Sequence, residues 1–478
     1  MRPNACIIAL LLTFNLSRAQ PLNYYFGNLH AHTAFSDGNK DSVSSGVGRP
    51  DGSYAYAKLS NDFDFLGISE HNHYSAAHSP GFKLPRYQVG LQMADAANQE
   101  GSFLAMYGME YGISSGNNGH VIIYGFNQLI GWESNVGGQI GNNYDIYNPK
   151  SDYDALFRKI KNNPAAFAYL AHPYWTDFSS NGKDSGAIAF SDYNAMYDSA
   201  IVGIPLRSGV ALSNAEDYKD YSTGDYFNYY KKMLWLGYHL GMGYDHDNHY
   251  TNFGRSNGGR LVIMAPSLTR ANLRQAMQQM HFYGSDDSNA KIDFSINGKG
   301  MGSIITDSFY PSIKVTHDDP DGETADSIKI WKGRKNSGGL WAEVIYVGLN
   351  TNTCILNDTE LKTGLEYFYF AEIKQKDQQL IVTSPIWFTP AAPLSIDENL
   401  NNDIFNFFPN PATKKLSLSF AFNHAYAVYV YDVSGRLIKE LRANEKQTEL
   451  DLSDLKRGLY SLKVIQDNKV SIKKLLIE

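Results

Sequence analysis

Disulfide-forming cysteine, excess positive charge and long apolar runs are all missing from this chain. Only two cysteines, Cys6 and Cys354, occur among 478 residues, which excludes a disulfide framework. Lysine and arginine number 42 against 49 acidic residues, and the net charge of −7 gives no electrostatic reason to expect a nucleic acid or an anionic membrane as partner. What is present, 43% hydrophobic and 19% charged residues, is the composition of a globular protein.

The N-terminal residues have the pattern of a signal peptide. Arg2 precedes an apolar run over 7–14, and small and polar residues follow up to Ala19. A short buried helix is the alternative, but the run has the length of a signal-peptide core and is too short to cross a bilayer. No later run approaches the roughly 18 apolar residues of a membrane helix. We expect removal of residues 1–19, with Cys6, to leave an exported soluble protein without a transmembrane segment.

Residues 20–290 alternate short apolar runs with helical patterns. This alternation is typical of a mostly parallel α/β fold, and the number of units favours a closed barrel. The expected strands are 63–69, 103–108, 120–126, 166–171, 209–214, 240–244 and 260–265. The expected helices are 86–99, 152–163, 225–238 and 269–280.

After residue 290 the pattern changes to alternating strands separated by turn signals. It predicts an antiparallel β-sandwich over 291–390. Residues 391–403 have linker composition, and residues 404–478 again consist of short strands. The sequence therefore predicts an α/β domain followed by a β-sandwich and a small all-β domain.

Histidine and acidic residues gather where the expected strands of 20–290 end. His71, Glu110 and His172 each follow such a strand closely. In α/β barrels, side chains from several strands meet at this edge, and imidazoles and carboxylates are ligands for Zn²⁺, Mn²⁺ or Fe²⁺. Eleven of the 13 histidines precede residue 290, a segregation that structural histidines would not show. The candidate metal ligands are His30, His32, Asp37, His71, Glu110, His120, His172, Asp245, Asp247 and His249; His120 is exceptional because it opens its run.

Each part of this set is a weak signal by itself. An isolated His-x-His pair is usually structural, although on a strand His30 and His32 point to the same side and can reach one ion. Together, the five segments predict two or three divalent metal ions at one site. The last segment, "GYDHDNH", leaves two ligand pairs open, Asp245 with His246 or Asp247 with His249, and the second pair is favoured.

The segments "LHAHTAFSDG", "DFDFLGISEHN", "GMEYG", "GHVIIYG", "LAHP" and "GYDHDNH" resemble, in this order, the motifs of the PHP (polymerase and histidinol phosphatase) superfamily. The likeness is greatest to its secreted metal-dependent phosphoesterases and covers about 22–290. It implies a distorted, TIM-like (β/α)7 barrel that holds up to three metal ions. One departure is Glu70, which stands where the family usually has an aspartate.

The resemblance also implies roles for single residues. It implies a first ion held by His30, His32, Glu110 and one of Asp245 and Asp247. Glu110 would bridge toward a second ion, helped by His172. The remaining ligands would be Asp37, His71, and His249 or His246, with His120 beside the third ion.

Clustered divalent ions lower the pKa of a bridging water and neutralise charge on a phosphoryl oxygen. We therefore predict a secreted metal-dependent phosphoesterase that hydrolyses phosphomonoesters or phosphodiesters with a metal-activated hydroxide. Two alternatives remain: hydrolysis of carboxylic or carbamate esters at the same metals, and a surface-displayed glycan-binding protein whose barrel is inert. The predicted catalytic residues are Glu110, His172, Asp247 and Arg255, with Arg260 as a second candidate for holding phosphate oxygens.

The C-terminal segments "FNFFPNPATKKLSLSF", "VYVYDVSGRLIKEL", "LSDLKRGLYSLKV" and "SIKKLLIE" resemble the type IX secretion sorting domain of Bacteroidetes. An ordinary small β-sandwich module is the alternative. The resemblance implies export first across the inner membrane and then across the outer membrane by the type IX machinery. The enzyme would be released or attached to the cell surface.

Overall fold

The computed structural model describes residues 22–60, 63–73, 82–112, 118–133, 139–150, 152–175, 177–178, 192–209, 211, 213–216, 226–391, 405–420, 425–433, 435–466 and 469–478. The chain divides into two compact units, Met1–Ala392 and Pro393–Glu478. Strands hold 41% of the described residues and helices 15%. The expected signal peptide, 1–19, lies outside the described residues, as does the expected linker apart from residue 391.

The first unit begins with three parallel strands separated by helices. The strands are β1 (Asn23–Asn28), β2 (Phe65–His71) and β3 (Leu104–Tyr111), which pair in that order. Helices α1 (Ser42–Ser45) and α2 (Pro50–Ala57) connect the first two strands, and α3 (Leu84–Ala97) connects the next two. Helix α3 begins at a proline-containing first turn and buries Tyr87 and Met93, which explains its start and its orientation.

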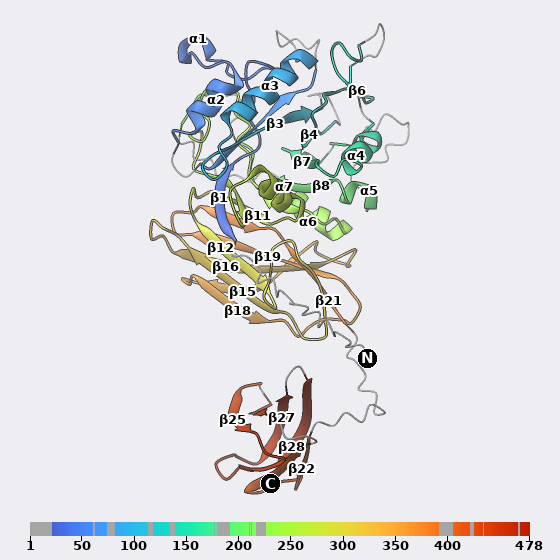
Figure 1. Cartoon of the computed structure of the whole chain (residues 1–478), viewed down its shortest axis with the longest axis vertical. Coiled ribbons are helices and arrows are strands. Elements are labelled where there is room, and N and C mark those ends of the chain that lie inside the picture. Colours follow the sequence, from blue (N-terminus) through green and yellow to red (C-terminus); the bar gives the residue numbers. More distant parts are fainter. Residues whose placement is uncertain are drawn as a thin grey trace, which may run out of the picture. The chain divides into compact units, whose positions relative to one another are not determined.

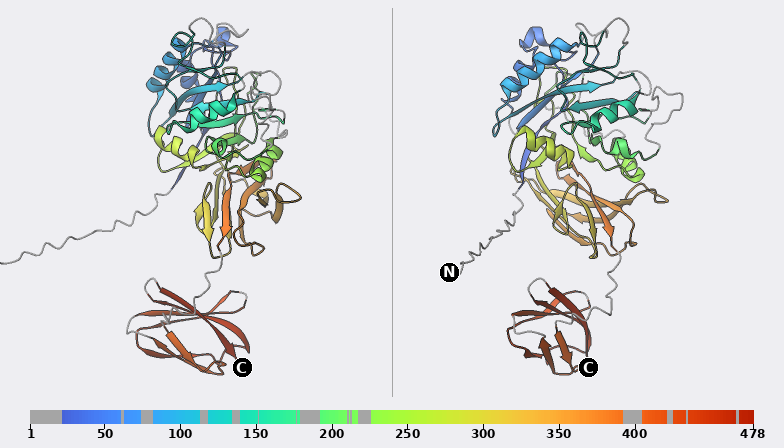
Figure 2. Two further views of the ribbon diagram at one scale, coloured as in Figure 1. Left: turned by 90° about the vertical axis from the view of Figure 1, so that its right-hand side faces the viewer. Right: turned by 45° about the vertical axis from the view of Figure 1, so that its right-hand side comes forward.

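A second set of parallel strands follows. It comprises β7 (Phe167–Ala171), β8 (Ile201–Pro205) and β9 (Gly241–Gly243). Helix α4 (Tyr153–Lys161) precedes β7, α5 (Ala195–Asp198) connects β7 to β8, and α6 (Tyr226–Leu236) connects β8 to β9. Strand β4 (His120–Tyr124) joins the two sets and runs antiparallel to both β3 and β7. Two short strands, β5 (Ile130–Gly131) and β6 (Ile146–Tyr147), form a separate pair. In the right-hand view of Figure 2, helices α1–α3 (blue) and helix α4 (teal) lie on opposite sides of the strands β1–β4 and β7–β9.

The predicted TIM-like (β/α)7 barrel is wrong. Strand β10 (Arg260–Ala265) pairs with β1 in the antiparallel direction, and β11 (Phe282–Ser285), which follows α7 (Arg270–Gln278), continues the sheet away from β1. The hydrogen-bonded order is β14-β21-β19-β20-β11-β10-β1-β2-β3-β4-β7-β8-β9, with β16 and β17 branching from β19. Within the described residues, this mixed sheet does not close, because β10 and β11 continue it into the sandwich.

One expected strand also lies elsewhere. Residues 209–214 were expected to form a strand, but those of them that are described do not, and 210 and 212 lie outside the described residues. The strand is β8, whose apolar residues Ile201, Val202 and Ile204 are buried. Beyond Pro205 the chain leaves the sheet and the backbone passes to the site described below. The helices α3, α4, α6 and α7 coincide with the expected ones to within a few residues.

Residues 291–390 form two packed sheets, and one of them is continuous with the sheet just described (Figure 1). The separate sheet contains β12 (Lys291–Ile296), β13 (Lys299–Gly300), β15 (Ser312–Asp318) and β18 (Thr353–Asn357). The continuous sheet contains β14 (Ile304–Asp307), β16 (Ala325–Arg334), β17 (Glu343–Leu349), β19 (Tyr367–Gln375), β20 (Leu380–Thr383) and β21 (Ile386–Pro390). Phe26 and Val262 of β1 and β10 share a buried cluster with sandwich residues such as Ile328, so both parts have a common core.

The described residues of the second unit form strands and no helix. Its sheets are β22-β23-β26 and β25-β24-β27-β28, with buried Leu416, Val430 and Leu475 between them. The strands are β22 (Phe405–Phe408), β23 (Lys415–Phe420), β24 (Tyr426–Tyr431), β25 (Leu437–Ala443), β26 (Gln447–Asp451), β27 (Gly458–Gln466) and β28 (Lys469–Ile477). None of the described helices combines the length and the apolarity that a membrane span requires.

Candidate metal-binding site

The ends of neighbouring strands bring the predicted ligands together. His71 is the last residue of β2 and pairs with Glu110 in the parallel β2–β3 ladder, so the two side chains leave the same face of the sheet. His120 opens β4 and pairs with Ala171, which directly precedes His172. Because β4 runs antiparallel to its neighbours, its first residue lies at the edge where β3 and β7 end.

A second pair of segments closes the site from the other side. Ala31 forms a β-bridge with Asn248, and the backbone N–H of His32 donates to the Asn248 carbonyl oxygen at 2.9 Å. A ligand stands on each side of Ala31 and on each side of Asn248. This bridge therefore brings four candidate ligands into one place: His30, His32, Asp247 and His249.

The ligand atoms form three overlapping groups, and within each group all atoms lie within 4.8 Å of one another. The first group is His30, His32, Glu110 and Asp247; the second is His32, Asp37, His71 and His249; the third is His71, Glu110 and His120. Ions such as Zn²⁺ bind nitrogen and oxygen at about 2.0–2.2 Å, so ligands of one ion lie about 3–4 Å apart. The described side chains thus have the spacing of a multi-metal centre.

Glu110 is the central residue of these groups. Its Oε2 lies 3.3 Å from His30 Nε2, 3.1 Å from His32 Nε2 and 3.3 Å from His71 Nδ1. Its Oε1 lies 2.7 Å from His120 Nδ1 and 3.1 Å from His172 Nε2. One buried carboxylate therefore faces five imidazoles with its two oxygens, the arrangement expected of a residue that bridges two ions.

Asp247 and Asp37 face the imidazoles from the opposite side. Asp247 Oδ1 lies 3.1 Å from His30 Nε2 and 3.2 Å from His32 Nε2. Asp37 Oδ2 lies 3.4 Å from His249 Nε2, and its Oδ1 lies 3.8 Å from His71 Nε2. Each aspartate therefore belongs to a different group.

The buried polar atoms of the groups fit divalent cations. Several of them have no hydrogen-bond partner within the described part of the chain: His30 Nε2, His32 Nε2, Asp37 Oδ1, His71 Nδ1, Glu110 Oε2 and Asp247 Oδ1. Burying polar atoms without a partner costs about 1–3 kcal/mol each. These atoms point at one another across distances that suit coordination, so an ion between them would satisfy them together.

The pKa values of these residues also indicate that the buried carboxylates require positive charge beside them. Burial opposes protonation of His30, but the charges of Asp247 and Glu110 outweigh it and hold the His30 pKa well above its ordinary value. The same two carboxylates, acting against burial, raise the pKa of His32 to about 10. Burial also opposes ionisation of Glu110, yet the charges of His71 and the neighbouring rings hold its pKa well below the ordinary value. Protons on His30 and His32 and bound cations are thus alternative sources of the charge that the carboxylates require.

Two of the candidate ligands occupy strained backbone positions. His172 has φ 30° and Asp247 has φ 49°, although neither is a glycine. Such left-handed conformations cost of order 1–3 kcal/mol in a non-glycine residue and persist where the surroundings impose them. The strain at both positions turns the side chain toward the cluster.

The alternatives in the last segment are separated by this geometry. Asp247 and His249 belong to the groups above, whereas Asp245 lies outside them and its Oδ2 lies 3.1 Å from His30 Nδ1. Asp245 thereby orients the His30 ring with Nε2 toward Glu110. His246 Nε2 donates to the Gly259 carbonyl at 2.7 Å, and burial followed by the charge of Arg260 lowers the His246 pKa to about 3. His246 is therefore turned away from the candidate ligands.

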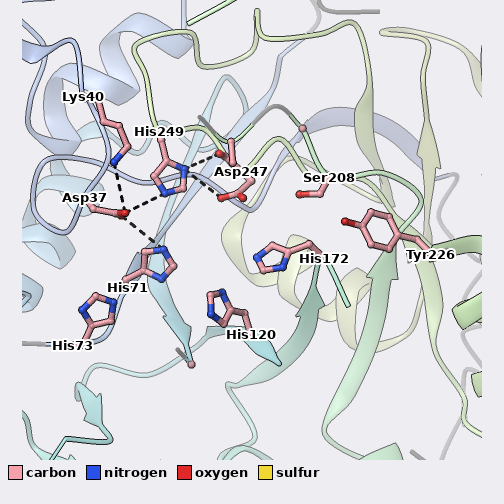
Figure 3. A pocket seen from close by; sticks show the side chains of 13 residues that line it. Asp37, Lys40, His71, His73, His120, His172, Ser208, Tyr226, Asp247 and His249 are labelled. Atoms are coloured by element: carbon pink, nitrogen blue, oxygen red, sulfur yellow. Dashed lines mark hydrogen bonds and ion pairs between the residues drawn. The ribbon is translucent and has the colours of Figure 1, made fainter. Parts of the chain in front are cut away.

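The groups open into a cavity of about 570 Å³ (Figure 3). Tyr226, the first residue of α6, contributes its ring to the wall, while its helical neighbours Tyr229 and Tyr230 are packed in the core. Burial raises the Tyr226 pKa to about 12, so its hydroxyl is a proton donor at neutral pH. The other polar lining residues include Lys40, His73 and Ser208.

Arg255 and Arg260 do not line this cavity. Arg255 lies over the Tyr56 ring and donates to the Leu59 carbonyl. Arg260 is buried and donates to the backbone carbonyls of residues 254, 257 and 259. The lysine at the cavity is Lys40, whose Nζ lies 3.8 Å from Asp37 Oδ2, and which was not among the residues predicted from the sequence. The sequence does indicate that Lys40 is near the site, because it follows the candidate ligand Asp37 by three residues.

Glu70 has a structural role next to the ligands. It is completely buried and accepts hydrogen bonds from the Thr33 backbone N–H at 3.1 Å and from the Thr33 and Ser36 hydroxyls. These bonds tie the loop between His32 and Asp37 to β2. The residue that departs from the expected aspartate thus holds two candidate ligands, His32 and Asp37, in position without itself belonging to the ligand groups.

Comparison with known proteins identifies the C-terminal unit. Residues 406–478 match a family described as a secretion system C-terminal sorting domain. This domain directs export by type IX secretion, so the prediction of a protein exported across the outer membrane, and secreted or attached to the cell surface, is confirmed. The type IX machinery is accordingly a partner during export. No PHP family model matches the chain, and no curated protein is significantly similar to it.

Solved structures with partial similarity contain fibronectin type III domains. One is the fourth such domain of a human protein, with 24% identity, a TM-score of 0.16, and coverage of 21% of this chain and 77% of that one. Another is a set of fibronectin(III)-like modules of Clostridium thermocellum CbhA, with 13% identity, a TM-score of 0.14, and coverage of 38% and 92%. A third, chicken CNTN1 FN1-FN3, has 10% identity, a TM-score of 0.17, and coverage of 38% and 67%. These scores are too low to support an argument about fold or function.

Proposed function

We propose that this protein is an exported metal-dependent hydrolase that cleaves phosphate esters. The observation that carries the proposal is the convergence of the three ligand groups on one cavity, with Glu110 shared between two of them. The order of the ligands along the chain resembles that of the PHP superfamily, and we assign the chemistry, though not the barrel, by that resemblance. Two or three divalent cations, Zn²⁺, Mn²⁺ or Fe²⁺, suit the mixed imidazole and carboxylate ligands.

When bound, such ions would make water a nucleophile near neutral pH and would neutralise charge on a phosphoryl oxygen. The chain's own residues hold and orient the reacting groups. Asp245 and the Asp247 carbonyl accept hydrogen bonds from His30 Nδ1 and His249 Nδ1, which leaves the Nε2 atoms of both rings as ligands. His172 is the most exposed of the central imidazoles, with 29% of its side chain accessible, so it can reach a substrate in the cavity.

The polar groups at the cavity favour an anionic substrate. Lys40 places a positive charge at the wall, where an arginine was expected from the sequence. The Tyr226 and Ser208 hydroxyls can donate hydrogen bonds to the oxygens of a phosphate group. In Figure 3 the Tyr226 hydroxyl points toward the side on which Ser208 and His172 lie. A neutral carboxylic or carbamate ester would make less use of Lys40.

The test compares activity and metal content in matched variants. Purified protein should hydrolyse p-nitrophenyl phosphate or its bis-ester, more with added Mn²⁺ or Zn²⁺, and contain about two or three metal ions. Glu110→Gln, which keeps the size of the side chain, should lose at least half of the metal and about 10³-fold in activity. His281→Gln changes a histidine outside the cavity and is the control. Full activity in Glu110→Gln or after chelation would refute the proposal.

A substrate panel separates the ester classes. Lys40→Gln should reduce hydrolysis of phosphate esters by about tenfold or more while changing hydrolysis of uncharged aryl acetates and carbamates little. Preferential loss of carboxylic or carbamate ester hydrolysis would assign the site to those substrates instead. If the purified protein contains no metal and hydrolyses none of these esters, a binding function such as glycan recognition is favoured instead.

A further inference from the structure

A separate group of oxygen ligands lies in the loops between the site-bearing sheet and the sandwich. Asp287 follows β11, and Asp319 and Glu323 lie between β15 and β16. Their carboxylate oxygens lie within 4.8 Å of one another, and none of these residues lines the cavity described above. The group contains no histidine or cysteine.

Two of the three carboxylates in this group are buried, and Glu323 is partly buried. Asp287 is 6% exposed and Asp319 is 8% exposed. Among the described residues, none of the three forms an ion pair with a basic side chain. Burial raises the Asp287 pKa; the hydrogen bond from the Asn289 N–H opposes this rise, and the charge of Asp319 adds to it. A bound cation would remove the repulsion between these carboxylates.

Two amide side chains lie next to the group. Gln375, at the end of β19, is completely buried, and its Nε2 donates to Asp319 Oδ2 at 2.7 Å. The Oε1 of the same amide is buried and has no hydrogen-bond partner among the described residues. Asn289 repeats this pattern: its Nδ2 donates to Asp321 Oδ2 at 3.1 Å, while its Oδ1 is buried and, within the described part of the chain, has no partner. Asp287 Oδ1 accepts from the backbone N–H groups of Asn289 and Ala290, and Asp319 Oδ1 accepts from the Asp321 N–H. The buried amide oxygens beside these carboxylates have no such partner among the described residues, and a cation would supply one.

We propose that these loops bind one Ca²⁺ ion through Asp287, Asp319 and Glu323, with the amide oxygens of Asn289 and Gln375 as further ligands. Ca²⁺ takes six to eight oxygen ligands at about 2.4 Å, so its ligand oxygens lie no more than about 4.8 Å apart, and the carboxylate oxygens of this group lie within that distance of one another. Zn²⁺ sites usually contain histidine or cysteine ligands, and this group contains neither, so its ligands suit Ca²⁺ better than Zn²⁺. This inference does not depend on the proposed hydrolase activity.

The ion would stabilise the junction between the sandwich and the cavity. Asp286, adjacent to Asp287, forms a buried ion pair with Arg207, with distances of 2.5 Å from Nε to Oδ1 and 2.8 Å from Nη2 to Oδ2. Arg207 directly precedes Ser208, which lines the cavity. Asp286 Oδ2 also accepts from the Leu380 N–H at 2.9 Å. Fixing Asp287 therefore also fixes the segment that supports one wall of the cavity.

The experiment measures Ca²⁺ uptake and thermal stability of the full chain in metal-depleted buffer. Wild type should bind one Ca²⁺, and its melting temperature should rise by about 3 °C at a hundredfold excess over Kd, with little effect of Mg²⁺ at the same concentration. The double variant Asp319→Asn/Glu323→Gln should bind no Ca²⁺ and show no shift. Asp318→Asn, which changes the exposed aspartate next to Asp319, is the matched control and should behave as wild type. Glu110→Gln should also bind Ca²⁺ normally.

The stability of the double variant without Ca²⁺ distinguishes a cation site from a structural cluster. Because the neutral amides remove the repulsion, this variant should melt at the same temperature as Ca²⁺-free wild type or higher. A variant that is destabilised equally with and without Ca²⁺ would show that the carboxylates act through hydrogen bonds, and would overturn the proposal. Ca²⁺ uptake that persists in the variant, no uptake by wild type, or an equal shift with Mg²⁺ would overturn it as well.

Discussion

Replacement of His239 by glutamine should destabilise the first unit strongly at pH 6 and hardly at pH 10. His239 lies between α6 and β9, and its Nδ1 is 3.0 Å from Asp198 Oδ2 at the end of α5. Its Nε2 is 3.4 Å from Glu366 Oε1, next to β19 of the sandwich. Only 22% of the side chain is exposed, so the two contacts are weakly screened by solvent. The protonated ring therefore links the site-bearing sheet to the sandwich.

The pKa of His239 sets the size and the pH range of the effect. Burial opposes protonation, but Asp198 and Glu366 outweigh it and raise the His239 pKa from 6.5 to about 9. Because one pKa unit corresponds to about 1.36 kcal/mol, this shift contributes about 3 kcal/mol to the free energy of unfolding below pH 6. A raised pKa in the folded state gives stability that is complete below the unfolded pKa and is lost as the pH rises through about 9. About 2 kcal/mol should remain at pH 7.5, and almost none at pH 10.

Urea unfolding at pH 6, 7.5 and 10, followed by tryptophan fluorescence, measures this contribution. All six tryptophans precede residue 392, so the signal reports the first unit. His281→Gln is the control: burial lowers the His281 pKa, so its replacement should not destabilise the protein more at pH 6 than at pH 7.5. An equal loss of stability in His239→Gln at pH 6 and pH 10 would show that the ring acts through packing, for example on Trp387, and would refute the electrostatic argument.

Two further changes test how the ligands are held. Asp245→Asn should lower metal affinity by about 10- to 100-fold without unfolding the protein, because Asp245 Oδ2 orients the His30 ring; titration against a chelator measures it, and unchanged affinity would contradict this role. Gly38→Ala should reduce bound metal and activity, because its new Cβ would lie 2.2 Å from the His32 carbonyl group and would push His32 away from the cluster. Gly48→Ala, whose Cβ would approach no atom closer than 3.4 Å, should leave metal content unchanged.

Most of the helices and strands of the first unit could be predicted because local apolar spacing determines them. Helix α4 shows why: Leu156, Phe157 and Ile160 are buried at helical spacing, and Asp152 caps the first turn by accepting from the Ala155 N–H. Strand β8 was missed because "IVGIP" is short and ends in proline, while the nearby "GVALSN" has a similar apolar content. The choice between them depends on the partners β7 and β9, which local sequence does not reveal.

The candidate site was only partly predictable for a related reason. The ligand types and their order are local properties, so the histidine and carboxylate set was found from the sequence. The choice between Asp245 and Asp247 depends on a left-handed backbone at Asp247, which the sequence "DHDNH" does not indicate. Arg255 follows the last motif closely along the chain but does not line the cavity, whereas Lys40 does. Arg255 instead lies over the Tyr56 ring.

The position of His120 in the sequence indicates a mixed sheet and not a parallel barrel. Every other candidate ligand of a central strand lies at or near the strand's C-terminal end or follows it, whereas His120 opens β4. Ligands must meet at one edge of the sheet, so a ligand at the start of a strand requires that strand to run against its neighbours. β4 does so, antiparallel to both β3 and β7. A ligand that opens its strand is therefore a direct signal of a mixed sheet, and it is incompatible with a barrel whose strands are all parallel.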